Sequence, residues 1–122
     1  MTVIRETDAP RFSVPGVGFT AYAAPTRGSA ELCTWQITVE AGTESAPHTL
    51  DRDEVFFVLS GAIRLRADGE VLGPRDVAVV PAGEPIEVTN AGDVPAEVYV
   101  AIRAGFTAQT ADGQALQPPW AL

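Results

Sequence analysis

His48 and Glu54 are the two residues of this sequence whose types and spacing best suit chemistry. His48 is the only histidine in the chain. An imidazole exchanges protons near neutral pH, and a neighbouring carboxylate can fix its tautomer. The pair could therefore transfer a proton, or it could be the remnant of a metal site. The alternative is a purely structural hydrogen bond between the two side chains.

Short β-strands are the elements that must position this pair. Glycines and prolines occur throughout the sequence, and the segments between them are rich in Val, Ile, Thr and aromatic residues, which is typical of strands. Residues 32–40 alternate between apolar and polar types, so one face of that strand should be buried. The apolar face carries Cys33, Trp35, Ile37 and Val39. Residues 54–59 are almost wholly apolar, which is typical of a strand covered on both faces.

The rest of the chain predicts more strands and no helix, because no segment has an apolar stripe at the helical period over ten or more residues. Residues 2–20 should supply one or two strands. Residues 107–122 look irregular apart from a turn at Asp112-Gly113, and Trp120 should dock on the domain or on a partner subunit. Further strands are expected at residues 63–67, 77–80, 86–89 and 97–103. Many short antiparallel strands indicate an all-β sandwich or barrel.

The segment 42–61 resembles the first signature motif of the cupin family. That motif runs glycine, five residues, His-x-His, three or four residues, glutamate, six residues and glycine. The matching positions in this chain are held by Gly42, His48, Glu54 and Gly61. Leu50 stands where the family has its second metal-binding histidine.

The segment 75–90 resembles the second motif of the same family. The residues that match it are Pro81, Gly83 and Asn90. Arg75 takes the position of a glycine, and Ile86 takes that of a histidine. The resemblance implies a single cupin domain over residues 1–122, with the double-stranded β-helix, or jelly-roll barrel, of this family.

The replaced histidines bear directly on metal binding. A catalytic zinc or iron site normally needs three protein ligands, and His48 and Glu54 supply two. The single cysteine, Cys33, is a soft donor, but buried cysteines commonly have no such role. The sequence therefore predicts no tightly bound metal and no cofactor.

The same replacements turn a polar metal cage into an apolar wall with one polar corner at His48 and Glu54. This composition is typical of a small-molecule pocket. The alternative is that the side chains simply fill the barrel, as in many small barrels. The residues expected to bind a small apolar organic molecule are Trp35, Ile37, Leu50, Phe56, Val58, Ile86 and Val88.

Composition limits the partners. The chain has 122 residues and a net charge of −8. An acidic surface repels nucleic acids and anionic membranes, so neither is expected as a partner.

No stretch approaches the ~20 apolar residues of a membrane span, and the first residues lack the apolar run of a signal peptide, so we expect a cytoplasmic protein. We also expect a homodimer, since the apolar strands have more faces than one small barrel can cover.

Three hypotheses of function are compatible with this sequence. The first is a metal-independent isomerase or cyclase that transfers a proton with His48 and Glu54 in an apolar pocket. The second is a non-catalytic module that binds or senses a small ligand. The third is a dioxygenase or other metal enzyme with an incomplete ligand set. In the first, the two side chains should lie within hydrogen-bonding reach inside the barrel, directly or through water.

Overall fold

The computed structural model describes residues 1–122 and consists almost entirely of strands and loops. Three short 3-10 segments are present, η1 (Glu6–Asp8), η2 (Pro25–Arg27) and η3 (Pro119–Ala121). None of the helical segments is long and apolar enough to cross a membrane. The strands are β1 (Arg11–Val14), β2 (Val17–Ala21), β3 (Leu32–Val39), β4 (His48–Leu50), β5 (Glu54–Ser60), β6 (Ile63–Arg64), β7 (Val77–Val80), β8 (Thr89–Asn90), β9 (Ala96–Arg103), β10 (Ala108–Thr110) and β11 (Ala115–Leu116).

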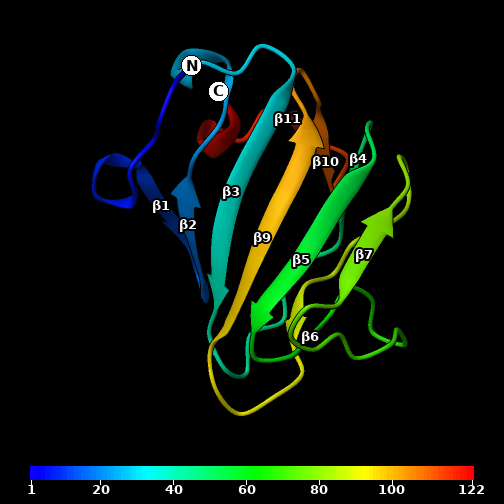
Figure 1. Ribbon diagram of the computed structural model, residues 1–122. Coiled ribbons are helices and arrows are strands. Elements are labelled where there is room, and N and C mark those ends of the chain that lie inside the picture. The colour runs from blue at the N-terminus through cyan, green and yellow to red at the C-terminus, as the bar shows by residue number, and fades with distance from the viewer.

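The main layer is a six-stranded antiparallel sheet in the order β1-β2-β3-β9-β5-β7 (Figure 1). A second sheet has three strands in the order β11-β10-β4, and β6 pairs with β8 in a third, two-stranded sheet. In Figure 1 β4, β10 and β11 lie behind the large sheet. The predicted all-β cupin-like jelly roll is therefore confirmed, although the sheets do not close into one continuous barrel.

β3 shows why the alternating pattern predicts this layer. Its inward side chains are buried and its outward ones are not, as the period of two requires. β9 pairs with it residue for residue from Leu32↔Arg103 to Val39↔Ala96 and has the same alternation. The two central strands thus present a continuous apolar face to the interior.

The prediction that residues 54–59 form a strand covered on both faces is wrong for the outer face. Glu54, Phe56 and Val58 point inward and are buried. On the outer face Phe57 is 40% exposed and Leu59 is 43% exposed. Within one chain, no second layer packs on that side of the large sheet.

The C-terminal region is more regular than predicted. β10 and β11 form a hairpin whose turn contains the expected Asp112-Gly113 pair. β10 also pairs with β4, setting Thr110 opposite His48 and Ala108 opposite Leu50. These strands are too short to leave a clear periodic signal.

Two predicted strands are shorter than expected. The strand at 63–67 is reduced to β6, because the chain forms a turn soon after it. A hydrogen bond from Gly69 N to Arg66 O closes this turn. The strand at 86–89 is reduced to a bridge at Ile86 followed by β8. The strand at 77–80 is confirmed as β7, and that at 97–103 as β9.

The backbone of Arg75 explains why the cupin motif has a glycine at this position. Arg75 has φ 73° and is the only non-glycine residue in the left-handed region. That conformation costs an L-residue about 1–2 kcal/mol, whereas glycine adopts it without a Cβ penalty. We expect Arg75→Gly to stabilise the fold by up to about 1 kcal/mol after its larger unfolded-state entropy is counted. Urea unfolding would measure this change, and a loss of stability would contradict the explanation.

Candidate functional site

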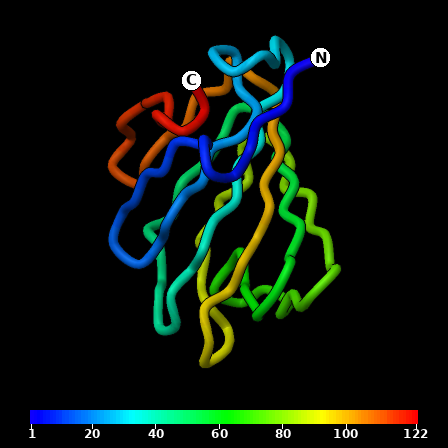
Figure 2. The backbone as a smooth tube through the Cα atoms, turned by 60° about the vertical axis from the view of Figure 1, so that its left-hand side comes forward, coloured from blue at the N-terminus to red at the C-terminus, as the bar shows by residue number.

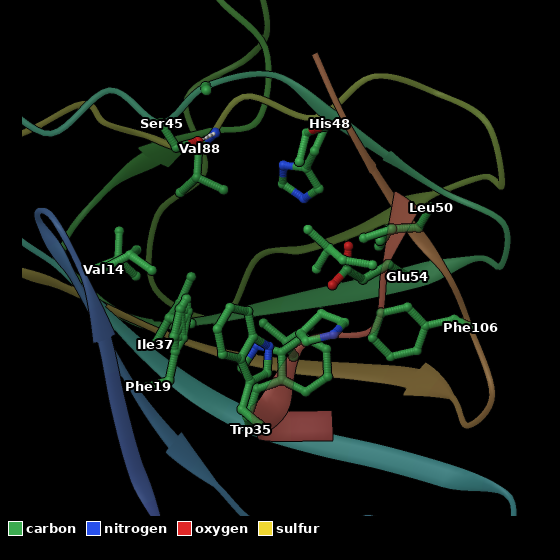
Figure 3. A pocket seen from close by; sticks show the side chains of 18 of the residues that line it. Val14, Phe19, Trp35, Ile37, Ser45, His48, Leu50, Glu54, Val88 and Phe106 are labelled. Atoms are coloured by element: carbon green, nitrogen blue, oxygen red, sulfur yellow. Dashed lines mark hydrogen bonds between the residues drawn. The ribbon is translucent and has the colours of Figure 1, made fainter. Parts of the chain in front are cut away.

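A cavity of about 280 Å³ lies in the interior, lined by 20 mostly apolar residues. Its walls come from the large sheet, from β4 and β10, and from both end regions of the chain. Figure 3 shows the imidazole of His48 and the carboxyl of Glu54 directed into this space, above the rings of Trp35 and Phe106. The cavity brings together seven of the residues proposed from the sequence, Trp35, Ile37, His48, Leu50, Glu54, Phe56 and Val88.

Two proposed ligand-binding residues, Val58 and Ile86, do not line the cavity. Both are fully buried in the hydrophobic core. Val58 lies further along β5 than Phe56, where the core is filled by side chains. Ile86 lies directly opposite His48, and two backbone hydrogen bonds of 3.0 and 2.8 Å join them. Ile86 therefore holds the strand of His48 in place through its backbone.

The sequence did not reveal the wall built by the two end regions. Val14, Val17 and Phe19 come from the N-terminal hairpin, and Leu116, Pro118 and Trp120 come from the C-terminal region. The two regions lie beside each other in Figure 2. Trp120 stacks on Phe19 with ring centroids 3.8 Å apart and an interplanar angle of 13°. The expected docking of Trp120 thus occurs on its own chain, and its large aromatic area was the one available signal.

Glu54 is the buried carboxyl of this cavity, and only 4% of the residue is exposed. Its Oε2 atom has no hydrogen-bond partner within the protein. Burial raises the pKa of Glu54 from 4.5 to about 8, since a low-dielectric site disfavours the charged form. The carboxyl therefore carries a proton at neutral pH and can act as a hydrogen-bond donor or an acid.

His48 projects from the first position of β4, lines the same cavity and is half-buried. Desolvation lowers the pKa of His48 below 6.5, and an interaction with the Ala46 backbone partly opposes this effect. At neutral pH the imidazole is therefore uncharged and can accept a proton.

No direct hydrogen bond joins His48 to Glu54, although both line the cavity. The expected contact is therefore absent in its direct form, and a contact through water stays a prediction. Burial raises the pKa of Glu54 and lowers that of His48, so both directions favour the neutral forms of the two groups. The arrangement instead offers a separate proton donor and proton acceptor around one space.

The donor set does not fit a three-ligand metal site. No group of three His, Cys, Asp or Glu residues gathers anywhere in the chain. Leu50 and Ile86 present aliphatic side chains at the family's histidine positions. Cys33 lies outside the cavity, with its Sγ 3.3 Å from the Ala121 carbonyl oxygen. His48 and Glu54 remain as two possible ligands, one fewer than such sites normally use.

We expect purified protein to hold far less than one equivalent of zinc, iron, nickel or manganese, because two ligands are too few. The double variant Leu50→His plus Ile86→His should raise the metal content towards one equivalent. Elemental analysis after dialysis would measure both, with Leu50→Ala plus Ile86→Ala, which adds no ligand, as the control. Stoichiometric metal lost on His48→Ala would contradict this expectation.

The fold, the two motif segments and the cavity define a class of protein. Residues 35–102 match the model of the cupin domain family. The chain belongs to the cupin family. Among curated protein sequences, none matches this chain.

Several solved cupin structures share the fold. The polyketide cyclase RemF from Streptomyces resistomycificus is 18% identical, with a TM-score of 0.73 over 84% of this chain and 79% of that one. An RmlC-like cupin protein from Ralstonia eutropha JMP134 is 12% identical, with a TM-score of 0.75 over 97% and 78%. Salicylate 1,2-dioxygenase from Pseudoaminobacter salicylatoxidans is 22% identical, with a TM-score of 0.69 over 84% of this chain and 32% of that one. At these identities the likeness concerns the fold alone.

Proposed function

We propose that this cupin is an enzyme that binds a small apolar organic molecule and transfers a proton within it, as an isomerase or cyclase does, without a metal. One observation carries the proposal: a neutral imidazole and a protonated carboxyl face the same apolar cavity. Pairs of groups whose surroundings move their pKa values in opposite directions commonly act as the base and the acid of a site.

The proposed step divides the work between the two side chains. His48 accepts a proton from a carbon atom beside a carbonyl group of the substrate. Glu54 donates its proton to the carbonyl oxygen, so the products are an enol, an imidazolium and a carboxylate. For a substrate with a C=C bond one carbon further from the carbonyl group, this enol is a dienol. The imidazolium of His48 gives its proton to the far carbon of the dienol while the carboxylate of Glu54 takes back the proton of the enol O–H, so the double bond moves next to the carbonyl group and both residues are restored. The apolar walls support this step by excluding water from the reacting atoms.

Deuterium exchange provides the test, because it needs no knowledge of the natural substrate. The probe is 1-tetralone, a small apolar ketone with exchangeable C–H bonds beside its carbonyl group. Proton NMR in D₂O should show exchange faster with the protein than in buffer. His48→Gln and Glu54→Gln should each slow the protein-dependent exchange about 100-fold or more, as loss of a general base or acid does. Glu70→Gln, at an exposed position, serves as the matched control.

The second candidate function is a binding or sensing module, favoured by the nearly complete apolar lining of the cavity. The His48→Gln variant separates the two functions. A binding module would hold 1-tetralone without exchanging its protons, and His48→Gln would change its affinity little. An exchange rate equal in wild type and His48→Gln would rule out the enzymatic role of His48.

We also propose that two copies associate through the outer face of β5 and β7. Phe57, Leu59, Val77 and Val79 are exposed on these neighbouring strands, and β7 is an edge of the large sheet. An uncovered apolar edge is a surface that proteins usually protect. Sedimentation velocity at micromolar concentration should give a dimer, and Val79→Glu should shift it to a monomer. A monomeric wild type would contradict this association.

A further inference from the structure

Four residues that line the cavity also lie at the protein surface, and together they show where the cavity opens. Val14 and Leu116 line it and are 45% and 39% exposed. Ala46 and Pro47 also belong to the lining and are exposed. The other lining residues are buried or half-buried. The opening therefore lies between β1, the segment before β4, and β11, which contain these four residues.

The topology of the sheets explains why the cavity opens at this place. β1 is an outer strand of the six-stranded sheet, and β11 is an outer strand of the three-stranded sheet. β1 pairs only with β2 and β11 only with β10, so no ladder of backbone hydrogen bonds joins the two sheets there. Figure 2 shows the N-terminal hairpin and the C-terminal region side by side. The cavity thus reaches the surface where two sheets meet without joining.

The rim of this opening is apolar throughout. Exposed apolar side chains that occur singly are normal, but here three separate segments of the chain bring theirs to one cavity. An apolar rim offers no hydrogen bond and no counter-charge to a molecule that must leave water to pass it. The rim therefore favours molecules that have little water to lose.

The lining behind the opening has the same preference. No lysine or arginine lines the cavity, and His48 and Glu54 are its only ionisable residues. Burial lowers the pKa of His48 and raises that of Glu54, so both directions favour the neutral forms. A charged molecule would enter this apolar space without a counter-charge, which is costly.

We propose that uncharged, apolar molecules enter the cavity through the opening between β1 and β11, and that Val14 and Leu116 determine which molecules pass. These two have the larger aliphatic side chains of the rim, and they belong to the two strands that do not join. Phenylalanine at both positions should narrow the opening and leave the interior unchanged. The inference concerns access to the ligand site of the proposed function and rests on that function in this respect alone.

A thiol placed inside the cavity measures access without knowledge of the natural ligand. Cys33→Ser provides the background, because Cys33 is the only cysteine of the chain. Val88→Cys adds the thiol at a lining position whose side chain Figure 3 shows directed into the cavity. Propyl methanethiosulfonate is an uncharged, apolar reagent that transfers its propylthio group to a thiolate and releases methanesulfinate. Mass spectrometry follows the rate of this reaction.

Val80→Cys is the matched control for burial. Val80 is 6% exposed and Val88 is 7% exposed, but Val80 does not line the cavity. The propyl reagent should modify Val88→Cys at least about tenfold faster than Val80→Cys, because thiol reactivity depends on access.

Narrowing the opening tests its location. Adding Val14→Phe and Leu116→Phe should slow the modification of Val88→Cys about tenfold or more. The matched control adds Val71→Phe and Val94→Phe, at exposed apolar positions outside the cavity lining, and should leave the rate within about twofold.

Two charged reagents of similar size test the selection at the opening. At pH 7 the 2-aminoethyl methanethiosulfonate is a cation, and the 2-sulfonatoethyl compound is an anion. Each rate is divided by the rate of the same reagent with an exposed thiol, Val94→Cys in the same background. On this scale both should modify Val88→Cys at least about tenfold more slowly than the propyl reagent does.

Three results would each overturn the inference. They are equal rates for Val88→Cys and Val80→Cys, a rate unchanged by Val14→Phe plus Leu116→Phe, and charged reagents that react as fast as the propyl one. A thermal melt controls for folding. If the double phenylalanine variant fails to fold, Val14→Ala plus Leu116→Ala takes its place and should speed the reaction about threefold, and an unchanged rate then contradicts the inference. None of these rates depends on deuterium exchange of 1-tetralone, so the inference and the proposed proton transfer can fail separately.

Discussion

Replacing Glu54 with glutamine is expected to stabilise the protein at high pH by up to about 5 kcal/mol, the free energy that corresponds to a pKa raised from 4.5 to about 8. The folded state favours the neutral carboxyl. The wild-type protein therefore has its full stability with respect to this group below about pH 4.5. It is lost as the pH rises through about 8, since ionising the buried group then favours unfolding. Glutamine has nearly the same shape and never ionises.

The difference in unfolding free energy between Glu54→Gln and wild type should therefore grow from pH 4.5 to about 8 and then level off. Urea unfolding at a series of pH values measures it, and the comparison cancels the contributions of groups that titrate alike in both proteins. The matched control is Glu70→Gln, an exposed position where the difference should stay near zero. A difference for Glu54→Gln that does not depend on pH would show that this carboxyl is not held in its neutral form.

The second large effect is expected at Gly61, the last residue of the first motif. Its φ is 77°, and a Cβ built there would lie 2.7 Å from Ala96 Cα and 2.9 Å from the Pro95 carbonyl oxygen. Backbone atoms cannot move aside as a flexible side chain can. Gly61→Ala should therefore lose about 3 kcal/mol or more of unfolding free energy, combining the left-handed strain with a displaced β9.

Gly83→Ala is the matched control for this substitution. Gly83 has φ 84°, but nothing lies within 4 Å of the position where its Cβ would be. Its replacement should cost only the conformational strain, about 1–2 kcal/mol. Urea unfolding of the two variants separates the cost of the left-handed backbone from the cost of the contact with Ala96. Equal losses of unfolding free energy would mean that the backbone near Ala96 moves aside at no cost.

The parts of the fold that could be predicted from the sequence are those with a local signal. β3 alternates cleanly because one face meets the core and the other does not, and the motif spacings located His48 and Glu54 at one cavity. β5 shows where such a signal misleads. Its apolar outer residues looked buried, yet Phe57 and Leu59 are exposed, since composition cannot say whether a second layer exists.

The rest of the site depends on contacts between distant parts of the chain. Phe19 and Trp120 form one wall only because the two end regions meet, and no local pattern encodes that meeting. The missing direct hydrogen bond between His48 and Glu54 is a matter of distance. Spacing placed both side chains at the cavity, but how far apart their polar atoms lie depends on the packing of the whole fold.

The wall that contains Trp120 is attached differently from the rest of the cavity. η3 is held by its packing and by hydrogen bonds from side chains, such as those of Arg27 and Cys33, to its carbonyl groups, and it belongs to no sheet. Its local opening therefore breaks no strand pairing and needs less free energy than global unfolding. A ligand in the cavity would pack against Trp120 and oppose this opening. An occupied cavity should therefore slow hydrogen exchange at the Ala121 amide, which is bonded to the Pro118 carbonyl at 3.1 Å, while the amides of β3 and β9 keep their rates.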